Sequence, residues 1–152
     1  QRAFVRTISW AVDGFAASVE ELREAMARIL LVDDSEDARL TLATILEDAG
    51  YEVFEASDGA EVPDMIDQHS PDLILLDVTM PRVDGFQALR NMKENPRHRD
   101  IPVLMVIAKG QPEDLSTARN LGARDFISKP WSDGEIELRV GWVLEATARV
   151  AH

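Results

Sequence analysis

The stretch Ile29-Leu30-Leu31-Val32-Asp33-Asp34 places two carboxylates directly after four consecutive apolar residues. A strand that is buried on both faces reads as a continuous Val/Ile/Leu run, which is typical of parallel sheets. A charge at the end of such a strand lies at the carboxyl edge of the sheet, where open α/β sheets bind their ligands. The stretch therefore predicts a buried parallel strand whose end carries functional acids.

Three further apolar runs repeat this arrangement along the chain. They lie at 73–76, 103–107 and 126–128, and Asp77 and Lys129 directly follow two of them. Helical patterns stand between the runs, as they do in βαβ units, so an α/β fold with a parallel sheet is expected from residue 28 onward.

Local signals refine the expected elements. The stretch 51–56 alternates between polar and apolar residues, which indicates a strand at the edge of the sheet. Gly50 and Gly122 are natural C-terminal stops for the helices before them. Pro63 lies where a helix should follow the edge strand, and past the first turn it would remove a backbone hydrogen bond. That helix should therefore start late or be kinked.

Composition excludes several classes of protein. The 152 residues include 28 Asp and Glu against 16 Lys and Arg, which gives a formal charge of −12. Direct nucleic-acid binding needs a basic footprint and is not expected. The absence of cysteine excludes disulfides and thiolate metal sites. No apolar run reaches the roughly 20 residues of a membrane span, and the start does not read as a signal peptide, so we expect no membrane contact and a cytoplasmic location.

Asp33, Asp34 and Asp77 should converge at one edge of the sheet. Converging carboxylates either retain a proton or bind a hard divalent cation such as Mg²⁺. A carboxylate beside the metal can attack phosphorus, and a lysine such as Lys129 can neutralise the transferring group. A turn acid or an acidic pair at a helix N-terminus would explain any one of these residues alone, but not all of them in this order.

Residues 28–148 resemble the receiver domain of bacterial response regulators, the phosphoacceptor of two-component signalling. The resemblance rests on four segments, namely Ile29 to Ser35, Leu76 to Gly85, Ile101 to Val106 and Gly122 to Pro130. It implies a flavodoxin-like (βα)5 doubly wound parallel sheet with strand order 2-1-3-4-5.

The resemblance also implies a role for each site residue. Asp77 would accept a phosphoryl group from a phosphohistidine of a sensor histidine kinase or a phosphotransfer protein. Asp34, Asp77 and the backbone carbonyl of Thr79 would hold Mg²⁺, or alternatively Mn²⁺, and Asp33 would act through water. Lys129 would pair with the phosphoryl group or with Asp77. Such a domain catalyses its own phosphorylation and dephosphorylation, yet it is a signalling switch rather than a metabolic enzyme.

The chain departs from the family pattern at the end of the fourth strand. Receivers typically carry Thr or Ser before Ala there, whereas this chain has Ile107 before Ala108. A hydrogen bond to a charged group contributes about 1.5–3 kcal/mol, so its loss should weaken the bias toward an active state roughly 10- to 100-fold. Phe126 matches the aromatic switch position, and the alternative is a simple core residue. We expect a domain that is chemically competent but atypical in its conformational switch.

Two loop residues occupy positions that tune acyl-phosphate hydrolysis in the family. Thr79 and Lys109 lie two residues beyond Asp77 and Ile107. Lys109 either shields the phosphate or is a solvated loop lysine, and we favour the second interpretation.

The last expected helix has two apolar sides. A core stripe should comprise Ile136, Val140, Val143 and Leu144. Leu138 and Trp142 fall on roughly the opposite side of the helical wheel. An outward tryptophan indicates a covered face. In receivers the fourth and fifth helices often form such a surface, so the covering group is expected to be residues 1–27, an output domain or a second copy of the chain.

The ends of the chain fall outside the receiver pattern. Residues 1–27 are expected to be an N-terminal extension, either the tail of an upstream domain or a cap, and 149–152 a C-terminal tail. Phe4, Ile8, Trp10 and Val12 alternate in part like a strand. Ser18 and Glu21 fit a capping box for a following helix. The missing initiator Met indicates a processed chain or a fragment.

Two other functions compete with the phosphoacceptor. A degenerate receiver would bind partners without phosphate control, and Ile107 is its only support. A phosphatase of the haloacid-dehalogenase type would need a second acid two residues after Asp77, where this chain has Thr79. His69, His98 and His152 lack metal-ligand spacing and are expected at the surface.

Overall fold

Strands and helices alternate along the computed structural model, which describes residues 18–80, 82–108 and 111–151. The strands are β1 (Arg28–Val32), β2 (Glu52–Ala56), β3 (Leu73–Asp77), β4 (Val103–Ala108) and β5 (Asp125–Lys129). The helices are α2 (Val19–Ala25), α3 (Glu36–Asp48), α4 (Val62–His69), α5 (Gly85–Glu94), α6 (Pro112–Asn120) and α7 (Glu135–Ala151), and a short 3₁₀ turn, η1 (Gly59–Glu61), precedes α4.

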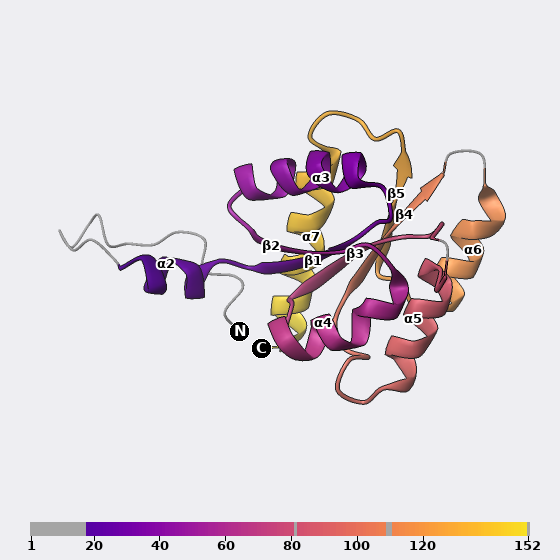
Figure 1. Cartoon of the computed structure of the whole chain (residues 1–152), viewed down its shortest axis with the longest axis horizontal. Coiled ribbons are helices and arrows are strands. Elements are labelled where there is room, and N and C mark those ends of the chain that lie inside the picture. The colour runs from indigo at the N-terminus through magenta and orange to yellow at the C-terminus, as the bar shows by residue number, and fades with distance from the viewer. Residues whose placement is uncertain (1–17, 81, 109–110, 152) are drawn as a thin grey trace.

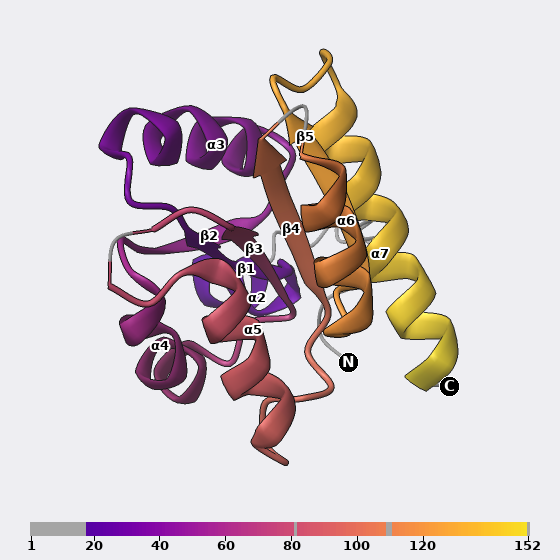
Figure 2. The same cartoon turned by 90° about the vertical axis from the view of Figure 1, so that its right-hand side faces the viewer.

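The five strands form one parallel sheet in the order β2-β1-β3-β4-β5. Helices α3 and α7 pack on one face, and α4, α5 and α6 pack on the other (Figures 1 and 2). This arrangement confirms the predicted flavodoxin-like, doubly wound fold. Because all five strands run in the same direction, their carboxyl ends lie along one edge.

Burial explains the apolar runs in the sequence. Every residue of β3 is buried, and in β1 only Arg28 is partly exposed. In contrast, Val53 and Phe54 of β2 are half-buried, as expected of the predicted edge strand. Helices cover both faces of the central strands, so neither face of these strands meets solvent and both are apolar.

Helix boundaries follow the turn residues. Gly50 and Gly122 adopt positive φ angles of 97° and 96°, as the predicted C-terminal stops require. After β2, the 3₁₀ turn η1 comes first, and α4 begins only at Val62, so Pro63 lies in its first turn. There its missing N–H is one that a helix leaves unsatisfied anyway. The predicted late start of this helix is confirmed.

Helix α7 separates its two apolar sides as predicted. Ile136, Val140, Val143 and Leu144 are buried against the sheet. Leu138 and Trp142 remain 50% and 55% exposed. At its start, the Ser132 N–H donates to the Glu135 carboxylate at 3.0 Å, which is one half of the predicted capping box.

Two predictions outside the sheet have different outcomes. The capping box before α2 is confirmed, since the Glu21 N–H donates to Ser18 Oγ and the Ser18 N–H donates to Glu21 Oε1, both at 3.1 Å. The partial strand pattern at Phe4, Ile8, Trp10 and Val12 lies outside the described residues.

No described helix is long and apolar enough to cross a membrane.

The prediction of surface histidines is wrong for His98. Its side chain is buried, and its Nε2 lies 2.7 Å from Asp67 Oδ1 of α4. The segment between α5 and β4 packs His98 against the end of α4, and Asp67 satisfies the polar ring. His69 is half-buried, with its ring stacked on that of Phe54, and His152 lies outside the described residues.

Candidate functional site

Three carboxylates meet at the carboxyl edge of the sheet. Val32 of β1 is in register with Leu76 of β3, so Asp33 and Asp77 follow at the same level. Asp34 is exposed, but it joins them: one carboxylate oxygen from each residue lies within 4.8 Å of the others. Asp33 and Asp77 are only 1% and 5% exposed. The predicted convergence of these acids is therefore present in the fold.

The Asp33 carboxylate is only half satisfied by hydrogen bonds. Its Oδ1 accepts the Ser35 N–H at 2.9 Å. Its Oδ2 is buried and accepts no hydrogen bond, although Lys129 Nζ forms an ion pair with it at 3.6 Å. A buried carboxylate oxygen that accepts no hydrogen bond is unfavourable unless cations compensate its charge. Together with Asp34 and Asp77, it offers the oxygen-only donor set that hard divalent cations prefer.

Lys129 lies across the site from the acids. It ends β5, where it is in register with Ala108 of β4, and its Nζ donates to Asp77 Oδ1 at 3.2 Å. Burial alone would lower the pKa of Lys129, but attraction by Asp77 and Asp33 outweighs it and raises that pKa. The lysine therefore carries a positive charge at neutral pH.

Asp77 experiences opposing influences. Burial raises its pKa, and the charges of Asp33 and Asp34 raise it further, whereas Lys129 only partly offsets them. The pKa of Asp77 therefore lies above that of an ordinary aspartate. A cation bound at the cluster would favour the ionised carboxylate.

The residues after Asp77 form a closed loop. Thr79 is exposed in it, and the Gly85 N–H that starts α5 donates to the Val78 carbonyl at 2.8 Å. A side chain at Gly85 would clash with the Asp77 carbonyl oxygen, so α5 begins against the backbone of the site. The start of α5 is thus hydrogen-bonded to the residue that directly follows β3.

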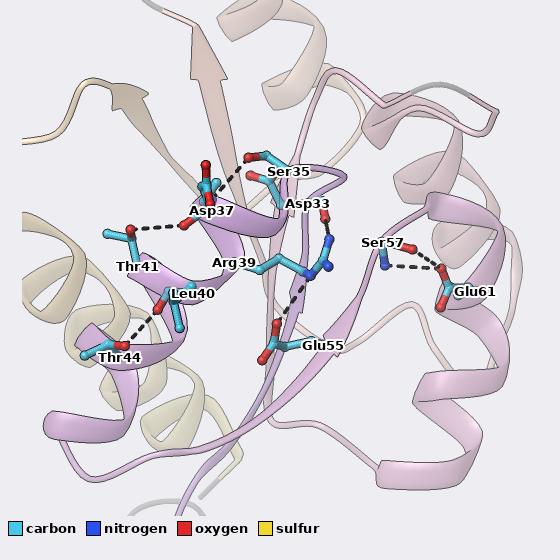
Figure 3. A network of polar contacts seen from close by, with 11 residues as sticks. Asp33, Ser35, Asp37, Arg39, Leu40, Thr41, Thr44, Glu55, Ser57 and Glu61 are labelled. Carbon is cyan, nitrogen blue, oxygen red and sulfur yellow. Dashed lines mark hydrogen bonds and ion pairs between the residues drawn. The ribbon is translucent and has the colours of Figure 1, made fainter.

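Arg39 of α3 contacts Asp33 at the end of β1, as Figure 3 shows. Its Nη1 donates to the backbone carbonyl of Asp33 at 2.7 Å, and its Nε lies 3.3 Å from Glu55 Oε1 of β2. Ser35 caps α3 by accepting the Ala38 N–H. Arg39 is not predictable from the sequence, because its partner is a main-chain oxygen. The only signal is a basic residue one turn into the helix after the acidic pair.

The switch-position residues lie on the sheet face opposite α3 and α7. Ile107 is 1% exposed and is in register with Ser128 of β5. Phe126 is half-buried against the same core, and the Arg119 guanidinium carbon lies 5.4 Å from its ring centroid. A cavity of about 190 Å³ is lined by Ile107 and Ser128 and by residues of the start of α6. Lys109 lies outside the described residues.

Comparison with known proteins yields consistent matches. The family model of the response regulator receiver domain matches residues 29–141. RpaA of Synechocystis sp., a DNA-binding dual master transcriptional regulator, is 39% identical over 125 residues, which are 82% of this chain and 52% of RpaA. Protein PilH of Pseudomonas aeruginosa is 39% identical over 105 residues, which are 69% of this chain and 87% of PilH.

A solved structure agrees with these sequence matches. The crystal structure of the receiver domain of NtrX from Brucella abortus superposes with a TM-score of 0.72 at 35% identity, and the match covers 77% of this chain and 98% of that one. This chain spans about half the length of RpaA and of other curated relatives that it matches.

Proposed function

The chain belongs to the response regulator receiver domain family, and from this premise we propose that Asp77 is a phosphoacceptor charged by a sensor histidine kinase or a phosphotransfer protein. One observation carries the proposal. A nearly buried carboxylate faces Lys129 at 3.2 Å and lies beside two further acids at the carboxyl edge of a parallel sheet. The domain would act as a signalling switch rather than as a metabolic enzyme.

The proposed reaction uses groups of this chain. An ionised Asp77 oxygen attacks phosphorus, the P–N bond of the phosphohistidine breaks, and the imidazole leaves with the bonding electrons. Lys129 offsets the charge on the transferring group. Water later hydrolyses the acyl phosphate, which restores the Asp77 carboxylate and releases phosphate.

The donor set fits a divalent cation, with Mg²⁺ first and Mn²⁺ as an alternative. Asp34, Asp77 and the Thr79 carbonyl would hold the ion, with Asp33 assisting through water. When bound, the ion supplies positive charge that offsets the acids and the incoming phosphoryl oxygens. The buried Asp33 Oδ2 supports this assignment, because among the described residues it accepts no hydrogen bond and has only the Lys129 ammonium at 3.6 Å.

The first test is the intact mass of the chain after incubation with Mg²⁺ and phosphoramidate. We expect one added phosphoryl group in the parent and none in Asp77→Asn or in the presence of EDTA. Addition to Asp77→Asn would move the acceptor elsewhere. No addition to the parent at any Mg²⁺ concentration would favour a receiver that binds its partners without phosphate control, the function for which Ile107 argues.

We further propose that phosphorylation is only weakly coupled to a conformational change in this chain. Ile107 is buried and carries no hydroxyl that could bond a phosphoryl group. Ile107→Thr should strengthen phosphate-dependent partner binding roughly 10-fold or more, because it restores a hydrogen bond to a charged group. Ile107→Val is the matched control, since valine has the shape of threonine without the hydroxyl. Equal behaviour of the two variants in partner binding and phosphate lifetime would contradict the proposal.

The exposed side of α7 is the proposed contact for the signalling output. Leu138 and Trp142 are separated by one helical turn and are both about half exposed. RpaA is a DNA-binding regulator, and the 125 residues that match this chain are only 52% of it. By analogy, an output domain or a second copy of the chain would cover this side, and the −12 charge argues against direct nucleic-acid contact by the receiver itself.

A further inference from the structure

A buried acid lies outside the cluster of Asp33, Asp34 and Asp77. Asp58, in the turn after β2, is only 4% exposed. The chemistry proposed above gives it no role. Since a buried carboxylate is retained only where partners satisfy it, its contacts indicate what it does.

The Asp58 carboxylate joins two segments that are far apart in the sequence. Its Oδ1 accepts the Ala60 N–H of η1 at 2.8 Å. Its Oδ2 pairs with Arg82 Nε of the loop between β3 and α5 at 2.7 Å. The Ala60 N–H and the Arg82 guanidinium lower the pKa of Asp58, so the carboxylate is charged at neutral pH.

Gly59 makes a second contact with the same loop. Its N–H donates to the Val83 carbonyl at 3.2 Å. A Cβ at Gly59 would clash with that oxygen, so the two backbones approach as closely as glycine allows. Two consecutive residues of the turn after β2 therefore hold two consecutive residues of the loop.

The held loop is the one that carries Thr79. Its base is closed by the hydrogen bond from the Gly85 N–H to the Val78 carbonyl, and its far side is held at Arg82 and Val83. Thr79 lies between these fixed points. When residues on both sides of a carbonyl are already held by contacts, less conformational entropy is lost as that carbonyl ligates an ion.

We propose that Asp58 is a positioning residue for the acidic site, which orders the loop and so places the Thr79 carbonyl and the Asp77 backbone for cation binding. This inference rests on the function proposed above. Asp58 itself touches neither the ion nor the phosphoryl group.

The test is the Mg²⁺ dissociation constant, measured by titration calorimetry on the full chain. Asp58→Ala should raise it about 10-fold, as loss of supporting contacts around metal sites typically does. Arg82→Ala should raise it in the same direction, and the double variant should be no worse than Asp58→Ala alone, because both changes remove one interaction. Asp58→Asn keeps an oxygen for the Ala60 N–H and should have a smaller effect.

Asp67→Ala provides a matched control. This acid also pairs with cationic or polar partners, His98 and Arg97, but it lies near the end of α4. Its loss should lower the melting temperature without changing the Mg²⁺ dissociation constant. The comparison separates loss of stability from loss of positioning.

The possible results separate failure of the inference about Asp58 from failure of the proposed phosphoacceptor function. If Asp58→Ala or, should it not fold, Asp58→Asn and Arg82→Ala bind Mg²⁺ like the parent, Asp58 is only a helix-capping residue and the inference fails. A parent that binds Mg²⁺ but gains no phosphoryl group overturns the phosphoacceptor while leaving this comparison valid. A parent that binds no Mg²⁺ overturns both.

Discussion

The surroundings of Asp77 disfavour the ionised form of its carboxyl group. Burial and the neighbouring acids raise its pKa, and Lys129 offsets this only in part. An acid whose pKa is raised by folding stabilises the protein below its unfolded pKa, and this contribution is lost as the pH rises through the folded pKa. Above this folded pKa and without a metal, the ionised Asp77 therefore destabilises the fold.

Replacing Asp77 by asparagine should consequently stabilise the metal-free protein. We expect Asp77→Asn to raise the melting temperature at pH 7 by roughly 2–4 °C, which is about 1 kcal/mol for a domain of this size. The difference from the parent should shrink as the pH falls and Asp77 of the parent becomes protonated. Thermal melts followed by circular dichroism across this pH range measure it. A variant that melts below the parent at pH 7 would show that the contact with Lys129 outweighs burial and repulsion.

Some residues of the site can be predicted from the sequence, and others cannot. Asp33 and Asp77 could be predicted because each directly follows an apolar run that must be a buried strand, and Lys129 because it follows the short strand pattern 126–128. Arg39 and Asp58 could not, because their partners are a main-chain oxygen and a residue 24 positions away. A periodic pattern records which face of an element is buried, but not which contacts form across a loop.

At the scale of the elements, most boundaries were predictable because they depend on local chemistry. Glycines in the left-handed region end α3 and α6, and Pro63 delays the start of α4. The placement of His98 was not predictable, because it depends on how the segment after α5 packs against α4. The start of α5 depends in the same way on a close contact with β3.

Two helical glycines allow this contact to be tested. Gly85→Ala forces a Cβ against the Asp77 carbonyl oxygen and should destabilise the protein by about 1–3 kcal/mol, because α5 or the end of β3 must shift. It should also slow phosphorylation by phosphoramidate. Gly141→Ala in α7 meets no atom within 4 Å and should stabilise the protein by about 0.5–1 kcal/mol through helix propensity. Urea unfolding of both variants measures the contrast, and similar free energies for the two would refute the close contact.

At the scale of the whole molecule, the acidic cluster adds local repulsion to a chain that already carries a net charge of −12. Any cation screens the net charge, but only a bound ion relieves the cluster. The two effects can be separated because screening depends on ionic strength, whereas binding depends on Mg²⁺ itself and on the site residues.

Mg²⁺ should therefore stabilise this chain more than sodium chloride of the same ionic strength. At 100-fold excess over its dissociation constant, a ligand that binds only the folded state adds about 2.7 kcal/mol, or roughly 5–10 °C in melting temperature. Asp33→Asn should lose most of this increment, because it removes the charge of a buried carboxylate whose Oδ2 accepts no hydrogen bond. Asp48→Asn removes the same charge from an exposed position at the end of α3 and should keep the increment. If Mg²⁺ and sodium chloride shift the melting temperature equally, or if both variants respond alike, the cluster acts only through its charge and the proposed metal site is wrong.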